Sequence, residues 1–330
     1  MGRHVAGDAP EMDRLVDEAC SGIGRDVGSL RIPRLAGVVL GGGYGRGEGG
    51  VMFGDWGTGK NACRLSNDLD FFAITEDGVP EAETIAAVGE ALKPVSENWT
   101  EKLGVDVDFA VKTPWRLRHD QERVMVQELV HGYFDVCGEK GEALFAGIER
   151  REPSAFPWME AARLLMNRGM GLLLARERGM GDGDRGTADF VARNINKCIL
   201  GAGDAILVSR GLYRWRAEDR AAAFAANGGD GLYARAVEWK FRPGAEPVCD
   251  WESARERWLD AWAKVYAVGD GDFGRSLRNA ARWLARRRTL GEVWTFGQDP
   301  VVRVLRGVGR CVRERRHLPP SLRRDWEIFN

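Results

Sequence analysis

The sequence predicts an α+β fold: a small mixed sheet with flanking helices over residues 1–150, followed by a C-terminal helical bundle over residues 151–330. Two observations predict it. The first half contains short apolar runs that end in glycines or alternate with polar residues, as strands do, whereas the second half contains long stretches with helical periodicity. The proline-bearing segment REPSAFP, at 151–157, marks the boundary between the two domains.

The elements of the first half follow from local patterns. Over residues 9–28, Met12, Val16 and Cys20 share one stripe of a helix. The apolar run LAGVVL, at 35–40, ends in glycines and predicts a buried strand that opens into a tight turn. The remaining predictions are strands over 69–75 and 105–111, a helix over 83–99 that breaks near Pro94, and a segment over 122–130 that is either helix or strand.

The second half is predicted to be helical throughout. Its tryptophans lie among alanine, leucine and valine, and Trp251, Trp258 and Trp262 keep helical spacing, which favours core packing over the stacking of exposed rings on bases. The predicted helices cover about 158–179, 188–211, 216–226, 229–240, 250–267, 273–289 and 299–316.

Composition limits the class of protein. A chain of 330 residues with 44% hydrophobic residues can bury two cores. No apolar run approaches the ~20 residues that span a bilayer, and the first fifteen residues turn acidic too soon for a signal peptide. We therefore expect a cytoplasmic protein that does not associate with membranes, with its six scattered cysteines reduced.

The charge is distributed unevenly. Residues 1–150 contain 16 Lys and Arg against 26 Asp and Glu, a balance of −10, whereas residues 151–330 contain 32 against 23, a balance of +9. An acidic half joined to a basic half suits a divalent-metal site that faces a positively charged binding surface for an anionic ligand. Two ordinary solvated surfaces explain the same numbers.

Two glycine motifs are predicted to be misleading. The G-x-G-x-x-G at 45–50 resembles a dinucleotide-binding turn, but three further glycines between 54 and 59 interrupt the helix that must follow such a turn. The segment GDWGTGKN resembles a P-loop, but Asn61 stands where Mg²⁺ binding requires Ser or Thr. A glycine-rich hairpin or loop between two strands explains residues 54–60 more economically.

Pairs of aspartates mark two of the predicted strands. Asp68 and Asp70 begin one strand with their side chains on the same face, and Asp106 and Asp108 repeat this pattern on another. If the strands are neighbours, the carboxylates converge, and converging carboxylates repel unless Mg²⁺ or Mn²⁺ neutralises them. Two such ions can support phosphoryl transfer. The alternative is two acidic strand ends in solvent.

The glycine turn adds a site for an anion. In GGGYGRG, at 41–47, successive backbone N–H groups are presented without side chains, and Arg46 can add a charge-assisted contact to phosphate. Taken together, GGGYGRGEGG, SNDLDFF and VDVDFAV resemble the signature of the DNA polymerase beta-like nucleotidyltransferase superfamily over residues 38–111. This resemblance implies a nucleotidyltransferase sheet that binds an NTP, with ATP expected, and two Mg²⁺ or Mn²⁺ ions.

The resemblance also implies roles for individual residues. Gly42 and Gly43 form the turn, Arg46 contacts phosphate, Asp68 and Asp70 bind metal, and Asp108, with Asp106 as its alternative, is the third carboxylate and helps to activate the acceptor hydroxyl. Gly43 stands where this family more often has Ser. The linker before Asp68 is also longer than usual, so that Asp55 or Lys60 can enter the site.

The helical half is expected to contribute cations. RNINKCILGAGDAILVSRGLY, at 193–213, resembles the helices that close over the nucleotide in this superfamily, with Lys197 and Arg193 as candidates for the triphosphate. The alternative is that both solvate a helix surface.

The expected activity is of the EC 2.7.7 type: transfer of a nucleoside monophosphate from an NTP to a hydroxyl acceptor, with release of pyrophosphate. A small-molecule acceptor is favoured because no sequence-specific nucleic-acid module is evident. The alternatives are a synthase of a nucleotide second messenger, an enzyme that modifies RNA or protein, and a non-catalytic relative that binds nucleotide. A degenerate relative usually lacks a carboxylate, and none is missing here. Oligomeric state is not predicted.

Overall fold

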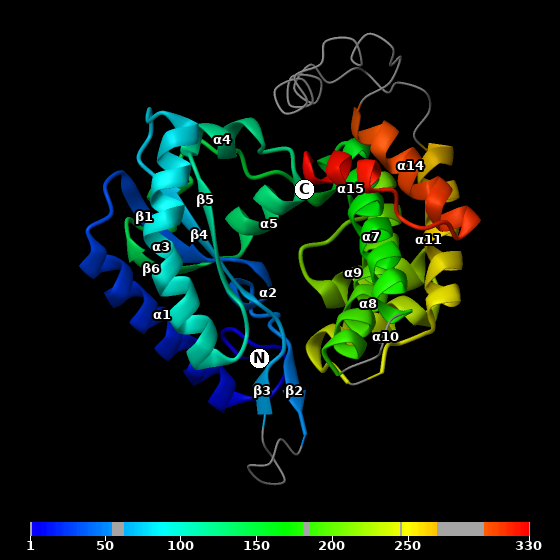
Figure 1. Cartoon of the computed structure of the whole chain (residues 1–330), viewed down its shortest axis with the longest axis horizontal. Coiled ribbons are helices and arrows are strands. Elements are labelled where there is room, and N and C mark those ends of the chain that lie inside the picture. Colours follow the sequence, from blue (N-terminus) through cyan, green and yellow to red (C-terminus); the bar gives the residue numbers. More distant parts are fainter. Residues whose placement is uncertain (1, 55–62, 181–184, 245, 269–299, 330) are drawn as a thin grey trace. The chain divides into compact units, whose positions relative to one another are not determined.

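The computed structural model describes two compact units (Figure 1). The first comprises Met1–Glu152 with Lys240–Pro243, and the second comprises Pro153–Trp239 with Gly244–Asn330. The described residues are 2–54, 63–180, 185–244, 246–268 and 300–329. The structure confirms a mixed α+β architecture, with a small mixed sheet and flanking helices followed by a helical C-terminal region. Among the described residues, no helix is both long and apolar enough to cross a membrane.

A four-stranded sheet in the order β5-β4-β1-β6 forms the centre of the first unit. Its strands are β1 (Leu35–Leu40), β4 (Leu69–Thr75), β5 (Val107–Lys112) and β6 (Phe134–Gly138). β4 runs antiparallel to β1 and parallel to β5, and β1 also pairs antiparallel with β6. The strand predictions are confirmed for β1, β4 and β5, although β5 begins two residues later than expected, so that Asp106 precedes the strand.

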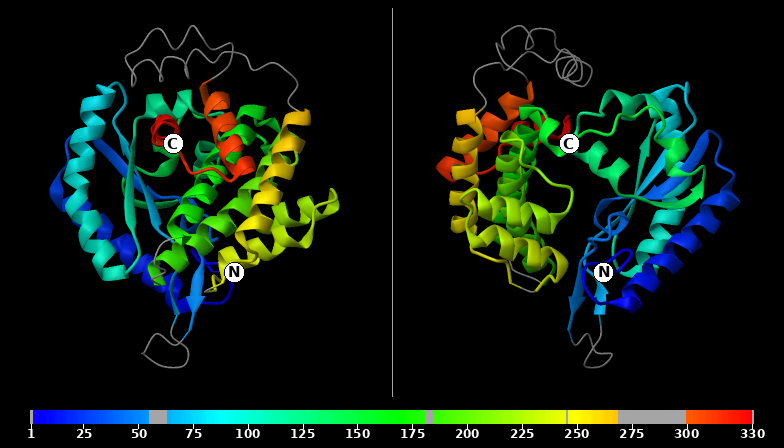
Figure 2. Two further views of the ribbon diagram at one scale, coloured as in Figure 1. Left: turned by 45° about the vertical axis from the view of Figure 1, so that its right-hand side comes forward. Right: turned by 180° about the vertical axis from the view of Figure 1, so that it is seen from behind.

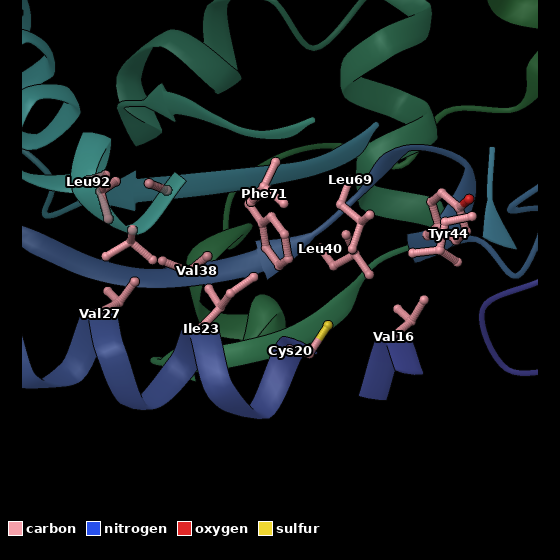
Figure 3. Close-up of a cluster of buried hydrophobic side chains, with 14 of the residues drawn as sticks. Val16, Cys20, Ile23, Val27, Val38, Leu40, Tyr44, Leu69, Phe71 and Leu92 are labelled. Carbon is pink, nitrogen blue, oxygen red and sulfur yellow. The ribbon is translucent and has the colours of Figure 1, made fainter. Parts of the chain in front are cut away.

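Two long helices, α1 (Pro10–Leu30) and α3 (Glu81–Leu103), cover one face of this sheet (Figures 1 and 2). Figure 3 shows Ile23 and Val27 of α1 directed at the sheet residues Val38 and Phe71, all of which are buried. Each such side chain contributes about 1.5–3 kcal/mol when it leaves water. The helix predicted over 9–28 is therefore confirmed, and its apolar stripe is the face that it buries.

Shorter helices cover the opposite face of the sheet: α4 (Pro114–His119), α5 (Val124–His131) and α6 (Gly141–Leu144). The segment over 122–130, which the sequence left open, is thus helical in α5. Phe72 and Ile74 of β4 pack against Leu129 of α5 in this core. Because side chains alternate along a strand, Asp70 lies on the same face of β4 as Phe72.

The prediction that the helix over 83–99 breaks near Pro94 is wrong. α3 runs through Pro94 from Glu81 to Leu103. Pro94 is exposed, so the carbonyl that its ring deprives of a hydrogen bond lies on the side of the helix that water reaches. On the opposite side, buried Val88, Leu92 and Val95 pack on the sheet and hold the helix together across the proline.

Two short strands flank the glycine-rich segment. β2 (Val51–Phe53) and β3 (Cys63–Leu65) pair antiparallel, with Val51 opposite Leu65, as the arms of a hairpin do. The residues between them, 55–62, lie outside the described part of the chain, as do the predictions for Asp55 and Lys60.

Helices build the second unit, and α7 and α8 lie side by side in it (Figure 2). Trp258 is fully buried and its Nε1 donates to Leu165 O at 2.9 Å, as core packing requires. The predicted helix over 273–289 lies outside the described residues. The helices are α7 (Trp158–Gly179), α8 (Arg185–Ser209), α9 (Ala217–Ala226), α10 (Gly231–Phe241), α11 (Trp251–Val268), α14 (Pro300–Glu314) and α15 (Pro320–Glu327). All six cysteines are free thiols.

Candidate active site

Asp70 and Asp108 lie directly opposite each other on neighbouring parallel strands. The register of β4 and β5 pairs Asp70 with Asp108, and Leu69 N donates to Asp106 O at 2.9 Å just before the strands begin. Register partners extend their side chains from the same face of a sheet, about 4.8 Å apart. Asp68 and Asp106 come two residues earlier in the chain, just before each strand begins, and both are near enough for their charges to act on Asp108. The condition that the sequence left open, that the two strands be neighbours, is met.

The charges of these aspartates repel one another. Partial desolvation of its carboxyl and the nearby charges of Asp68 and Asp106 raise the pKa of Asp108 above its ordinary value, although the residue as a whole is exposed. In the part of the chain that is described, no three His, Cys, Asp or Glu side chains are grouped closely enough to hold a metal ion by themselves. An open set of carboxylates still fits Mg²⁺, which keeps several waters and is commonly bound by one or two carboxylates together with substrate phosphates.

Replacing Asp108 by Asn should stabilise the metal-free protein and weaken its response to Mg²⁺. Because the folded-state pKa of Asp108 lies above the ordinary 3.8, the folded protein binds more protons than the unfolded chain in that range, and stability falls as the pH rises through it. At neutral pH the ionised carboxylate therefore destabilises the fold, and Mg²⁺ binding should offset this. Melting temperatures with and without Mg²⁺ measure both effects. A lower melting temperature for metal-free Asp108→Asn, with an undiminished response to Mg²⁺, would contradict the prediction.

The glycine turn follows β1 and lies against the start of β4. Gly41 N donates to Asp70 O at 2.8 Å, and the short helix α2 (Gly42–Gly45) begins at the next residue. Gly42 has a φ of +60°, in the left-handed region, and a Cβ added to it would collide with Oδ2 of Asp70. At Gly43, by contrast, an added Cβ would meet nothing closer than Glu48 O at 3.4 Å, which is ordinary contact. Only Gly42 is therefore required to be glycine for the Asp70 carboxylate to keep its position.

The hydroxyl of Tyr44 ties the glycine turn to the segment that leads into Asp68. Tyr44 is 1% exposed and lies close to Leu40 and Leu69 (Figure 3). Its hydroxyl donates to Gly50 O at 2.8 Å and accepts from the backbone N–H groups of Ser66, at 3.1 Å, and Asn67, at 3.4 Å. Burial raises the pKa of Tyr44 to about 12, so the hydroxyl stays protonated at neutral pH.

Removing this hydroxyl in Tyr44→Phe should destabilise the protein by about 1–3 kcal/mol, because backbone groups of the turn and of the segment before Asp68 lose their partner while the ring stays buried. Urea unfolding monitored by circular dichroism measures the change. Tyr133→Phe is the matched control, since the Tyr133 hydroxyl has no hydrogen-bond partner among the described residues and its loss should cost little. Equal stability of the two variants would show that the Tyr44 hydrogen bonds contribute nothing.

Arg46 lies against carboxylates. Its Nη1 is 3.4 Å from Glu128 Oε2 and its Nε is 4.0 Å from Glu48 Oε2, and the side chain is only 15% exposed. Glu48, which is buried, also accepts a hydrogen bond from Lys240 Nζ at 2.6 Å. Beside the glycine turn, negative and positive side chains therefore alternate in the order Glu128, Arg46, Glu48 and Lys240. A contact between Arg46 and phosphate stays a prediction, and it requires the guanidinium to exchange these partners for the ligand.

Arg193 and Lys197 lie on α8 in the second unit. Arg193 is half-buried and pairs with Asp189 at 2.9 Å, one turn earlier on the helix, and Lys197 is exposed. Their part in binding a triphosphate stays a prediction.

Sequence reasoning missed Glu48, Lys240 and the role of Tyr44. The role of Tyr44 could have been predicted from its place inside the glycine motif. A large aromatic residue among glycines is expected to pack against neighbouring elements. Glu48 also lies close to the motif, but it resembles any other surface carboxylate in the sequence. Lys240 is almost two hundred residues away, and nothing in its surroundings pairs it with Glu48.

Comparison with known proteins assigns no family. No family model matches the chain, and no curated protein matches it significantly. The activity of this chain is therefore inferred from the turn that follows β1 and from the aspartates at the starts of β4 and β5.

Proposed function

We propose that the first unit is a metal-dependent nucleotidyltransferase, which moves a nucleoside monophosphate from an NTP to a hydroxyl acceptor and releases pyrophosphate. The observation that carries this proposal is the pairing of Asp70 with Asp108, beside a turn in which Gly42 leaves no room for a side chain against the Asp70 carboxylate. Metal-binding carboxylates and phosphate-binding amides must lie next to each other for phosphoryl transfer. ATP is the donor that we expect.

The proposal divides the work among the site residues. Asp68, Asp70 and Asp108 would hold Mg²⁺ or Mn²⁺ together with the triphosphate, and the metal would neutralise charge on the phosphates. The backbone N–H groups of the glycine turn would contact phosphate oxygens. Asp108 suits the acceptance of a proton from the acceptor hydroxyl, because its carboxylate lies opposite Asp70 at the start of the neighbouring strand. Asp106 precedes the strand, whereas Asp108 lies in it opposite Asp70, which makes Asp106 the weaker candidate for this role.

The test is pyrophosphate release from each of the four NTPs, with Mg²⁺, with Mn²⁺ and with EDTA, in the presence of hydroxylated small molecules. Metal-dependent release that requires one of these acceptors supports the proposal as stated. Release from nucleotide alone would indicate a second-messenger synthase, and release that requires RNA or protein would indicate a modifying enzyme. Metal-dependent binding of NTP without turnover under any of these conditions would indicate a non-catalytic relative. If the protein binds no NTP, the proposal fails.

A further inference from the structure

The imidazole of His4 joins helix α1 to the glycine turn. The side chain is completely buried and packs edge-on to Phe134, with 4.9 Å between the ring centroids. Its Nδ1 lies 3.2 Å from the carbonyl oxygen of Tyr44, and its Nε2 lies 3.0 Å from Oδ1 of Asp17 on α1. A buried histidine with both ring nitrogens engaged is a specific connection between two elements and does more than fill space.

The partner of Nδ1 decides the direction of its hydrogen bond. A carbonyl oxygen can only accept, so the Nδ1 of His4 carries a proton and donates to Tyr44 O. The carboxylate of Asp17 also binds the guanidinium of Arg3 at 3.1 Å. The imidazole therefore bridges a carbonyl oxygen of the turn and a carboxylate oxygen of α1.

The backbone around His4 holds the same turn. Gly49 N donates to His4 O and Ala6 N donates to Gly49 O, both at 2.9 Å, so the chain next to His4 pairs with the exit of the turn. On the other side, the Asp13 carboxylate accepts three successive N–H groups and fixes this segment to α1. The donors are Arg3, at 3.1 Å, His4, at 2.7 Å, and Val5, at 3.0 Å.

We propose that His4 is a positioning residue of the phosphate-binding turn. A turn that binds phosphate must direct N–H groups at the anion and keep its carbonyl oxygens away, because both the oxygens and the phosphate are negative. By donating to the Tyr44 carbonyl, His4 holds one of these oxygens in the protein interior. It acts there together with two backbone hydrogen bonds, Gly45 N to Gly41 O at 2.8 Å and Gly47 N to Tyr44 O at 3.4 Å, which hold the same peptide between Tyr44 and Gly45. The inference rests on the proposed function, since the consequence for phosphate presupposes that the turn binds it.

Two amide substitutions separate the two ends of the connection. Asn places its amide nitrogen near the position of Nδ1, so that His4→Asn keeps a donor for Tyr44 O and loses the contact with Asp17. Gln reaches the position of Nε2, so that His4→Gln keeps the contact with Asp17 and loses the one with the turn. Both variants lose the ring that packs on Phe134, which makes them matched for burial.

The experiment compares the wild type and both variants in the full chain by two readouts. The first is amide hydrogen exchange of the peptide that contains residues 44–50, with exchange of the α3 peptide, 81–103, as an internal reference. The second is kcat and KM for ATP with Mg²⁺ in the pyrophosphate assay. For His4→Gln we expect faster exchange in 44–50 alone and a KM raised by about tenfold or more, with a smaller change in kcat. His4→Asn should restore both readouts to near the wild-type values.

The inference is overturned if His4→Gln matches the wild type in both readouts, or if His4→Asn is the more damaged variant, because the histidine would then serve only to attach this segment to α1. Failure of the proposed function is distinguishable. In that case the wild type itself shows no turnover, and the exchange of residues 44–50 still decides whether His4 holds the turn.

Discussion

Asp70→Asn is expected to abolish NTP turnover while leaving the fold intact. Asp70 pairs with Asp108 across β4 and β5, and its Oδ2 lies against the glycine turn, so it is the carboxylate that touches both halves of the proposed site. Asn keeps the shape but removes the negative charge that binds metal. We expect kcat to fall by about a thousandfold or more, which corresponds to roughly 4 kcal/mol of transition-state stabilisation. Pyrophosphate release measures turnover, and circular dichroism with thermal melting checks the fold.

Asp106→Asn is the matched control for this prediction. It makes the same chemical change at the entrance of the neighbouring strand, but Asp106 precedes β5 and is not the register partner of Asp70, so we expect a loss of no more than about tenfold. Comparison of Asp70→Asn with Asp106→Asn also tests whether Asp106 or Asp108 is the third carboxylate, which the sequence left open. Undiminished turnover by Asp70→Asn would refute the proposed function, and equal losses from both substitutions would place the third carboxylate at Asp106.

Local patterns were enough to predict most of the fold. Short apolar runs predicted β1 and β4 at their observed positions, and helical periodicity predicted α1 and α7. The short strands β2 and β6 were missed because three to five residues show no reliable period, and β6 is only half-buried. Pro94 misled the prediction of α3 because propensity was weighed without the tertiary packing that holds the helix across it.

The candidate site was predicted in its parts but not in its connections. Aspartates two apart at a strand entrance are visible in the sequence, but that β5 pairs with β4 in the register of Asp70 and Asp108 depends on the topology of the sheet. The same limit applies to His4, which lies forty residues before the carbonyl that it binds. Arg46 was expected to bind phosphate because its charge was considered alone, whereas the fold supplies Glu48 and Glu128 beside it. Long-range partners of this kind leave no periodic signal in one sequence.

Gly42→Ala should reduce turnover almost as severely as the loss of Asp70. Gly42 has a φ of +60°, which an alanine adopts at a cost of about 1–2 kcal/mol. Its Cβ would also occupy the space of Oδ2 of Asp70, so that either the carboxylate or the turn must move. A displacement of about 1 Å in a catalytic group can cost roughly a hundredfold in rate. We therefore expect kcat to fall by about a hundredfold or more, with a loss of stability that urea unfolding resolves as 1–2 kcal/mol.

The neighbouring glycine separates this effect from a general sensitivity of the turn. At Gly43 φ is not positive and an added Cβ makes only ordinary contact, so Gly43→Ala should lose far less activity than Gly42→Ala. Gly43→Ser introduces the hydroxyl that the resembled superfamily more often carries there, and the free space at this position allows it to reach a phosphate. We expect it to lower the KM for ATP relative to Gly43→Ala. If Gly42→Ala and Gly43→Ala are equally impaired, the contact between Gly42 and Asp70 does not set the position of the carboxylate, and the geometric basis of the proposed site is lost.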